Sequence, residues 1–308
     1  MFGFALIALG IGAPQLMLDH GAELDWFQST KIWIELDLAL TGFWVATIHI
    51  MTAARPFIEP RIFADRNFSA GLAVIFVIGM VLMASMALLP PLLSRIYGYP
   101  VITVGLIMAP RGMGTMISMI LVGQLMKLVD PRALIVTGLL LTAWSVHEMS
   151  GLSPLMGSGP IIQTGIIQGM GMGLVFVPLS AMAFAPMALN LRADGTALFS
   201  LMRNIGSSIG ISVLTYMLTV NTAVNQSELM APLSFTNPEM LQLGRMFAAM
   251  TTAQAATVTS SMVSQQALFI AYLDDFVIMM WMCLLTIPLV ALLRRPSAGA
   301  AMQVAHAE

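Results

Sequence analysis

The chain has 308 residues, of which 58% are hydrophobic and only 9% charged, and its mean hydropathy is +0.88. A soluble domain carries about 25% charged residues, so this composition excludes an ordinary soluble protein and predicts an all-α, polytopic membrane protein. The net charge of −2, with thirteen Lys and Arg scattered along the chain, excludes a nucleic-acid-binding protein.

Apolar runs long enough to cross a hydrocarbon core of about 30 Å predict eight transmembrane helices. The predicted spans cover residues 2–18, 33–53, 69–90, 101–126, 133–152, 161–186, 196–220 and 270–293. Eight Lys and Arg lie on one side of this arrangement and three on the other, which places the first set and the C-terminal tail in the cytoplasm. The first run starts at residue 2 with no positive segment before it, so we expect a chain whose upstream part is missing rather than a cleaved signal peptide.

The linkers divide the chain into four parts. Residues 1–53 form a helix pair, and residues 54–68 form a cytoplasmic linker with two prolines and three arginines. Residues 69–295 form a block of six spans that divides into three plus three, as in transporters built from inverted repeats. Within this block, residues 221–269 lie outside the membrane, either as a solvated helical hairpin with a helix over 238–266 or as a docking surface for a periplasmic partner. Residues 296–308 form a disordered tail.

One charged residue lies deep inside a predicted span. The run 101–126 is apolar except for Arg111, which is about 15 Å from either end at 1.5 Å per residue. An unpaired guanidinium at that depth costs at least about 2.5–3.5 kcal/mol, so it should face protein or water rather than lipid. A proline and two glycines beside it should loosen the helix. We interpret Arg111 as lining a substrate pathway; the alternative is a structural ion pair, for which Glu148 is the nearest candidate by depth.

Two other spans combine glycines with polar side chains. In 161–186, the glycines at spacing four around Gln168 predict a helix-packing stripe, and Gln168 is a second candidate for the pathway. In 196–220, Arg203 either lines the pathway or extends back to the headgroups. Asn204 and Ser208 follow it and are further candidates, beside a GxxxG pair that favours close packing.

The acidic residues are placed away from mid-membrane. Those that come near a predicted span lie within about six residues of its end; they are Glu35, Asp37, Glu148, Asp274 and Asp275. A proton-coupled pump needs a titrating group at depth. On its own the chain is therefore expected to be incomplete as a pump.

The sequence carries no recognisable metal-binding pattern. Cys283 is the only cysteine, and the four histidines are dispersed in sequence. We therefore expect no enzyme, no catalytic residue, no metal site and no bound cofactor.

Five segments carry a resemblance to a known family. They are LMLDHGAELDWF (16–27), RNF (66–68), YGY (97–99), the charged turn 123–132 and RNIGSSIG (203–210). These segments resemble the EmrB/QacA-type drug:proton antiporters, the fourteen-helix branch of the major facilitator superfamily, and the resemblance covers nearly the whole chain. The acidic-aromatic loop is its most specific part. The turn, with Gly123, Lys127, Asp130 and Arg132, resembles the second copy of the superfamily's G-x-x-x-D-x-x-G-R-[RK] loop.

The resemblance implies a major-facilitator C-terminal six-helix bundle preceded by two linker helices. The family's first six helices, with their proton-relay residues and antiporter motif, have no counterpart here. The implied function is export of hydrophobic or cationic small molecules by alternating access, driven by the proton gradient, in a bacterial inner membrane. The turn 123–132 would gate the cytoplasmic face. Implied partners are the lipid bilayer, the N-terminal six-helix bundle and, in Gram-negative members, a periplasmic adaptor and an outer-membrane channel.

Two other interpretations stay open. The chain is a separate half-transporter that pairs with another six-helix polypeptide, or it is a non-transporting scaffold or truncated remnant.

Overall fold

The structure is a computed structural model that describes residues 9–10, 12–14, 16–17, 20–21, 24, 26–52, 60–188, 191–231 and 252–293. In these residues the chain is helical, which confirms the all-α prediction. The helices are η1 (Trp26–Gln28), α2 (Thr30–Thr52), η2 (Pro60–Ala64), α3 (Arg66–Arg95), α4 (Val101–Leu125), α5 (Pro131–Ser150), α6 (Ser158–Phe184), α7 (Arg192–Met230) and α9 (Thr252–Val290).

Six of these helices, α3 to α7 and α9, are long and apolar enough to cross a membrane. The predicted count of eight is therefore not reached among the described residues. The predicted second span is helical as α2, which carries Lys31, Glu35 and Asp37 in its first half. The predicted first span, 2–18, lies largely outside the described residues.

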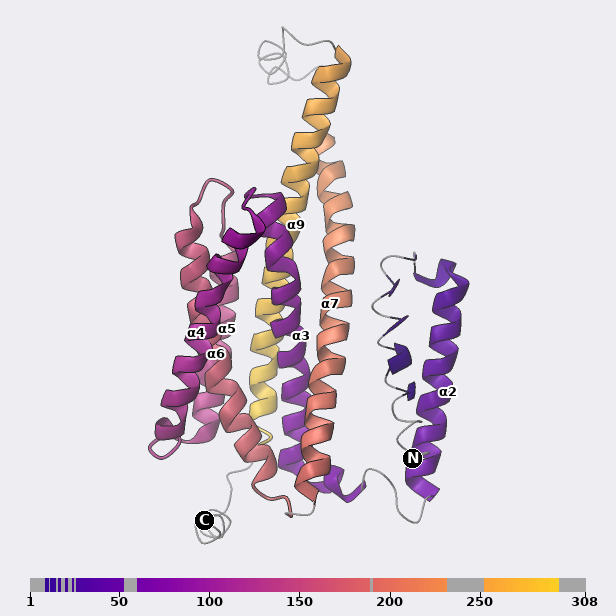
Figure 1. Cartoon of the computed structure of the whole chain (residues 1–308), viewed down its shortest axis with the longest axis vertical. Helices are drawn as coiled ribbons and strands as arrows, with labels where there is room; N and C mark the ends of the chain where they lie inside the picture. Colours follow the sequence, from indigo (N-terminus) through magenta and orange to yellow (C-terminus); the bar gives the residue numbers. More distant parts are fainter. Residues whose placement is uncertain are drawn as a thin grey trace.

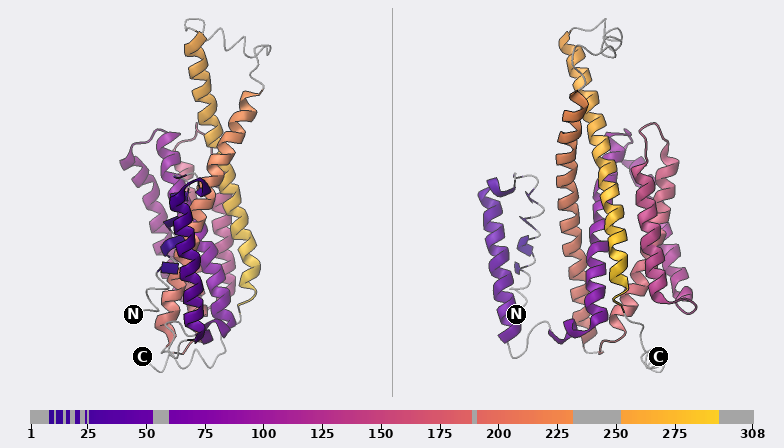
Figure 2. Two further views of the ribbon diagram at one scale, coloured as in Figure 1. Left: turned by 90° about the vertical axis from the view of Figure 1, so that its right-hand side faces the viewer. Right: turned by 180° about the vertical axis from the view of Figure 1, so that it is seen from behind.

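The six helices form one bundle with two groups (Figure 1). Helices α4, α5 and α6 lie on one side, and α3, α7 and α9 lie on the other. Helix α2 stands outside the bundle, beyond α7, as Figure 2 also shows from behind. Helices α7 and α9 rise together past the ends of the other helices.

The lengths of α7 and α9 correct the predicted boundaries. Helix α7 continues from the predicted end at 220 to Met230, and α9 begins at Thr252 rather than at 270. Residues 211–230 and 252–287 contain neither glycine nor proline, so nothing in the chain interrupts the helical hydrogen bonds there. The helix predicted over 238–266 and the span at 270–293 are one helix from Thr252 onward. Residues 232–251 lie outside the described part.

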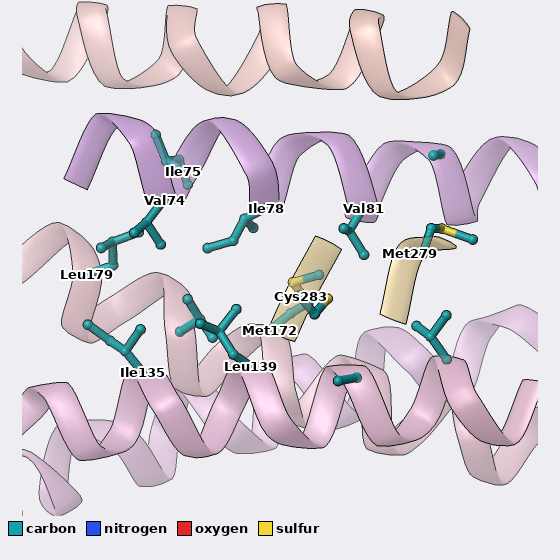
Figure 3. Close-up of a cluster of buried hydrophobic side chains, with 14 of the residues drawn as sticks. Val74, Ile75, Ile78, Val81, Ile135, Leu139, Met172, Leu179, Met279 and Cys283 are labelled. Carbon is teal, nitrogen blue, oxygen red and sulfur yellow. The ribbon is translucent and has the colours of Figure 1, made fainter. Parts of the chain in front are cut away.

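The apolar core lies where α3, α5, α6 and α9 meet (Figure 3). Ile75 and Ile78 from α3, Leu139 from α5, Met172 from α6 and Met279 from α9 are all buried in it. Each helix supplies these residues at a spacing of three or four, which turns one face of the helix to the centre. This core fixes the six helices against one another.

The helix contacts have an internal symmetry. The repeats become visible when α3, α4 and α5 are matched in order with α6, α7 and α9. The contact between α3 and α7 then corresponds to the contact between α6 and α4. In the same way, the contact between α3 and α9 corresponds to the contact between α6 and α5. The contact between α7 and α9 has no counterpart of similar extent between α4 and α5 among the described residues. This pattern is the one expected of two three-helix repeats.

Candidate substrate-pathway site

The Arg111 side chain is buried where α4 meets α3 and α6. Arg111 is only 8% exposed, and its Nη2 donates a hydrogen bond of 2.9 Å to the Ser85 hydroxyl oxygen on α3. The Gln168 amide on α6 donates to the same hydroxyl oxygen at 3.4 Å, and Ser85 itself donates to the Leu82 carbonyl at 3.0 Å. Two of the predicted pathway residues, Arg111 and Gln168, are thus brought together by Ser85, which the sequence analysis did not single out.

This cluster keeps unused hydrogen-bonding capacity. Arg111 Nη1 and Gln168 Oε1 are buried and have no hydrogen-bond partner. Arg111 forms no ion pair within the described residues, and Glu148, the predicted alternative partner, is exposed at the outer end of α5. A buried guanidinium without a carboxylate is costly unless other polar groups satisfy it. The site can therefore accept a water molecule or a polar group of a ligand.

The helix around Arg111 is unbroken. Helix α4 runs through Pro110 from Val101 to Leu125, so the predicted loosening produces no interruption. The glycines of α6 instead allow a close approach to α4: a Cβ atom at Gly169 would overlap the Arg111 carbonyl oxygen, and one at Gly173 would lie 2.7 Å from the Ser118 Cβ. The predicted packing stripe on α6 is thus present, and it holds the backbone of Arg111 in place.

Arg203 lies on α7, whose backbone packs against α3. The Arg203 side chain is half-buried, and its guanidinium carbon lies 5.7 Å from the centre of the Phe176 ring on α6. A cation at this distance from an aromatic ring is attracted by the ring's negative face. Asn204 is exposed and Ser208 is buried on the same helix. Arg203 thus reaches toward α6 from the opposite side to Arg111.

A repeated motif relates the two arginines. The segment RGMGTMIS (111–118) in α4 recurs 92 residues later as RNIGSSIG (203–210) in α7. Both have Arg first, Gly fourth, Thr or Ser fifth and Ile seventh. The predicted division into three plus three helices did not rest on this motif, although the motif can be read from the sequence.

The two copies of the motif make equivalent contacts. Thr115 Oγ1 donates to the Arg111 carbonyl at 3.1 Å, and Ser207 Oγ donates to the Arg203 carbonyl at 2.8 Å. A Cβ atom at Gly79 on α3 would overlap the Arg203 carbonyl oxygen, as one at Gly169 on α6 would overlap that of Arg111. The two arginines therefore occupy corresponding places in the two halves of the bundle.

A second pair of glycines extends this correspondence. A Cβ atom at Gly114 would overlap the Ile166 carbonyl oxygen on α6, and one at Gly206 would overlap the Phe76 carbonyl oxygen on α3. Each of these glycines stands three residues after the arginine of its motif. The backbones of α4 and α7 are thus in direct contact with the central helices α6 and α3 over a full turn.

The predicted gating turn connects α4 to α5. Asp130 is the N-cap of α5 and accepts a hydrogen bond of 3.1 Å from the Arg132 backbone N–H. Lys127 is exposed, and Gly123 near the end of α4 has open space around its Cα. Arg132 is half-buried, and its Nε has no hydrogen-bond partner. The turn is therefore well formed at Asp130 and carries an unused donor at Arg132.

Two features at the end of the molecule opposite the turn 123–132 were not predicted. The His20 Nδ1 lies 3.1 Å from Glu35 Oε1, and Lys31 Nζ lies 3.3 Å from His20 Nε2, which ties the segment before η1 to α2.

An open cavity of about 510 Å³ between α5 and α6 is lined by Trp144, His147, Glu148 and Gln163 among others. None of the predicted pathway residues lines this cavity.

Comparison with known proteins places this bundle in a family. The sequence pattern of the Major Facilitator Superfamily matches residues 2–211, which is more than half of the chain. The chain belongs to the Major Facilitator Superfamily, a class of membrane transporters. Its relatives include the multidrug export protein EmrB of Escherichia coli K12, which is 28% identical over 280 residues, covering 89% of this chain and 54% of that protein.

Other relatives agree with this assignment. The EmrB protein of Haemophilus influenzae is 27% identical over 77% of this chain and 46% of its own length, and the fatty acid resistance protein FarB of Neisseria gonorrhoeae is 30% identical over 69% and 42%. The chain spans about half the length of the curated relatives that it matches. The resemblance to EmrB-type proteins is thus confirmed, and the chain is a multi-pass protein of the bacterial inner membrane.

A solved structure supports the fold alone. A bacterial homologue of the human lysosomal transporter Spinster, in an inward-facing and unoccupied conformation, matches with a TM-score of 0.51 and 17% sequence identity. The match covers 95% of this chain and 70% of that one.

Proposed function

We propose that this chain is the C-terminal portion of a multidrug efflux transporter, which exports hydrophobic or cationic compounds by proton-coupled antiport through alternating access. The observation that carries the proposal is the Arg111 cluster. A cation at about 15 Å from the end of a membrane helix is expensive and is retained mainly for a role in transport. Here its guanidinium faces α3 and α6, with Nη1 available to a ligand or water.

The paired motif supports alternating access. In carriers built from inverted repeats, corresponding residues of the two repeats exchange environments as the bundle rocks. Arg111 is buried and Arg203 is half-buried in this structure, so the two equivalent positions differ in exposure. We infer that the exposure of the two arginines changes between the conformations of the transport cycle, with the turn 123–132 gating the cytoplasmic face.

The chemistry of these residues bears on the substrate class. Arg111 and Arg203 make the described part of the pathway positive, which suits uncharged hydrophobic compounds. Cationic compounds need acidic groups, which the proposed N-terminal six-helix bundle would have to supply. The 28 methionines of the chain offer adaptable apolar surface for ligands of varied shape.

The partners follow from the same proposal. An N-terminal bundle would dock on helices whose apolar side chains are exposed, and α4 exposes Ile102, Leu106, Met113 and Ile120. The protruding ends of α7 and α9 offer a surface for a periplasmic adaptor, which would connect to an outer-membrane channel. If the N-terminal bundle is a separate polypeptide, the chain is a half-transporter, and the two would purify together.

The test is drug resistance in cells that express the intact transporter containing this chain. We expect Arg111→Ala to abolish resistance at unchanged membrane levels, and Arg111→Lys to retain part of it. The matched control is Arg66→Ala, because Arg66 is exposed at the start of α3. Full resistance in the Arg111→Ala variant would refute the assignment.

A further inference from the structure

Asp275 on α9 is a carboxylate in the core of the bundle. Its side chain is 0% exposed, and neither Oδ1 nor Oδ2 has a hydrogen-bond partner. Ala271, Tyr272, Phe276 and Met279 are buried beside it at helical spacing, so Asp275 occupies a position in the apolar stripe of α9. An ionised carboxylate without a partner is strongly disfavoured in such surroundings. The side chain is therefore held as a neutral acid in this conformation.

The depth of Asp275 fits a membrane site. It stands fifteen residues before Val290, the last residue of α9, which is about 22 Å along the helix. It lies in the outer half of the bundle, on the side where α3 ends. Asp275 was not predicted to act at membrane depth, because its position near the end of a predicted span carries no information on the direction of its side chain.

Few charged groups surround Asp275. Asp274 precedes it on α9 and is half-buried. Tyr272, one turn toward the outer end, interacts electrostatically with both Asp275 and Arg95, the last residue of α3. The titratable groups in the outer halves of the helices packed on α9 are Arg95 on α3, His147 and Glu148 on α5, and Tyr216 and Glu228 on α7. Within the described residues, none of them forms an ion pair with Asp275.

The surroundings of Asp275 offer no paired cation. Asp275 is sealed in the core, Tyr272 is buried on the same helix, and Arg95 is exposed at the outer end of α3. Within the described residues no cation is paired with Asp275.

We propose that Asp275 is a proton-binding residue of this half of the transporter. Its role in coupling rests on the proposed function, whereas its protonation rests on the burial and the missing partners alone. In a conformation that admits water, the O–H bond of the carboxylic acid breaks, the electron pair stays on the carboxylate oxygen, and the proton passes to a water molecule. In the sealed conformation the carboxylate has taken up a proton, and the site is neutral.

The first test measures the protonation of the Asp275 carboxyl group directly. Infrared spectra of the purified intact transporter at neutral pH are compared in H₂O and D₂O, with Asp275→Asn and the matched control Asp274→Asn. We expect the carbonyl band of a protonated, solvent-shielded carboxylic acid in the wild type and in Asp274→Asn, and its loss in Asp275→Asn. Asp275→Glu should retain the band at a shifted frequency, which covers the case in which the amide variant does not fold. A wild-type band that persists in Asp275→Asn, or no difference between the wild type and that variant, overturns the proposal.

The second test measures the coupling of substrate transport to the proton gradient. In proteoliposomes, we expect Asp275→Asn to reduce substrate transport driven by a pH gradient at least about tenfold, while substrate exchange without a gradient is retained. Asp274→Asn should stay within about twofold of the wild type for both. Gradient-driven transport by Asp275→Asn at the wild-type rate contradicts a coupling role. If the wild type itself does not transport, the proposed function fails, whereas the infrared result still decides whether Asp275 holds a proton.

Discussion

The backbone carbonyl oxygen of Arg111 lies so close to Gly169 that a single methyl group on that glycine would overlap it. The same relationship joins Arg203 to Gly79 in the other repeat. The backbones of the two arginines are thus positioned by close contact between helices, and this contact does not involve their side chains.

The first prediction concerns this contact. Gly169→Ala should destabilise the bundle by about 1–3 kcal/mol, because α4 and α6 must move apart. Gly112→Ala is the matched control, since a Cβ there meets nothing within 4 Å. The midpoint of thermal unfolding in detergent measures both variants. Equal midpoints for the two would show that the helices are not held this closely.

The second prediction concerns Ser85. Ser85→Ala removes the acceptor of the Arg111 Nη2 hydrogen bond and leaves the buried guanidinium without a partner, which should cost about 1–3 kcal/mol. Ser94→Ala, at an exposed position of the same helix, should change stability by less than about 0.5 kcal/mol. Unfolding midpoints of the two variants provide the comparison. A neutral Ser85→Ala variant is incompatible with the Arg111 cluster described above.

The third prediction concerns the outer loops. Tyr97, between α3 and α4, donates a hydrogen bond of 2.9 Å to the Ser153 carbonyl oxygen between α5 and α6. Tyr97→Phe should therefore lower stability by about 0.5–1.5 kcal/mol. Tyr99→Phe, on the residue stacked against it, is the control.

The Tyr97 phenol also predicts a pH dependence. Burial, and to a lesser degree repulsion from Tyr99, raises the pKa of Tyr97 above its ordinary value of 10.0. The folded state therefore holds a proton that the unfolded state releases, so this contribution to stability is present below pH 10.0 and is lost as the pH rises through the folded pKa. The difference in unfolding midpoint between wild type and Tyr97→Phe should shrink from about pH 9 to about pH 11. A difference that grows over this range would mean that folding lowers the pKa of Tyr97 rather than raising it.

The fourth prediction concerns the segment before η1. Glu35 is 8% exposed and contacts both His20, at 3.1 Å, and Lys31, at 4.0 Å. Glu35→Gln should weaken the attachment of the segment around His20 to α2. Faster hydrogen exchange of residues 20–21 would report this loss, whereas Asp37→Asn, at an exposed position of the same helix, should leave the exchange unchanged.

The sequence alone predicted much of the fold, because apolar length marks each membrane helix directly. The six helices of the bundle were found, and the boundaries failed where the chain continues as helix beyond the apolar run, at the end of α7 and the start of α9. The prolines do not interrupt the helices: α3 continues through Pro90 and Pro91, and α4 continues through Pro110.

The site was predicted less completely. Arg111 and Gln168 were predicted as pathway residues from their chemistry, and the structure brings them together. Ser85 between them could not be predicted, since a serine in an apolar helix gives no signal of its partner. The burial of Asp275 could not be predicted either, because hydropathy gives depth, whereas burial depends on which face α9 turns to its neighbours. The repeated motif of Arg111 and Arg203 was readable from the sequence, and its contacts made it evident.

The central claim is the proposed role of Arg111 in substrate transport. The most direct measurement is substrate transport driven by a pH gradient in proteoliposomes, with wild type, Arg111→Ala and Arg66→Ala at equal reconstituted amounts. The account predicts that Arg111→Ala loses transport while Arg66→Ala retains it. Transport by Arg111→Ala at the wild-type rate would contradict the account.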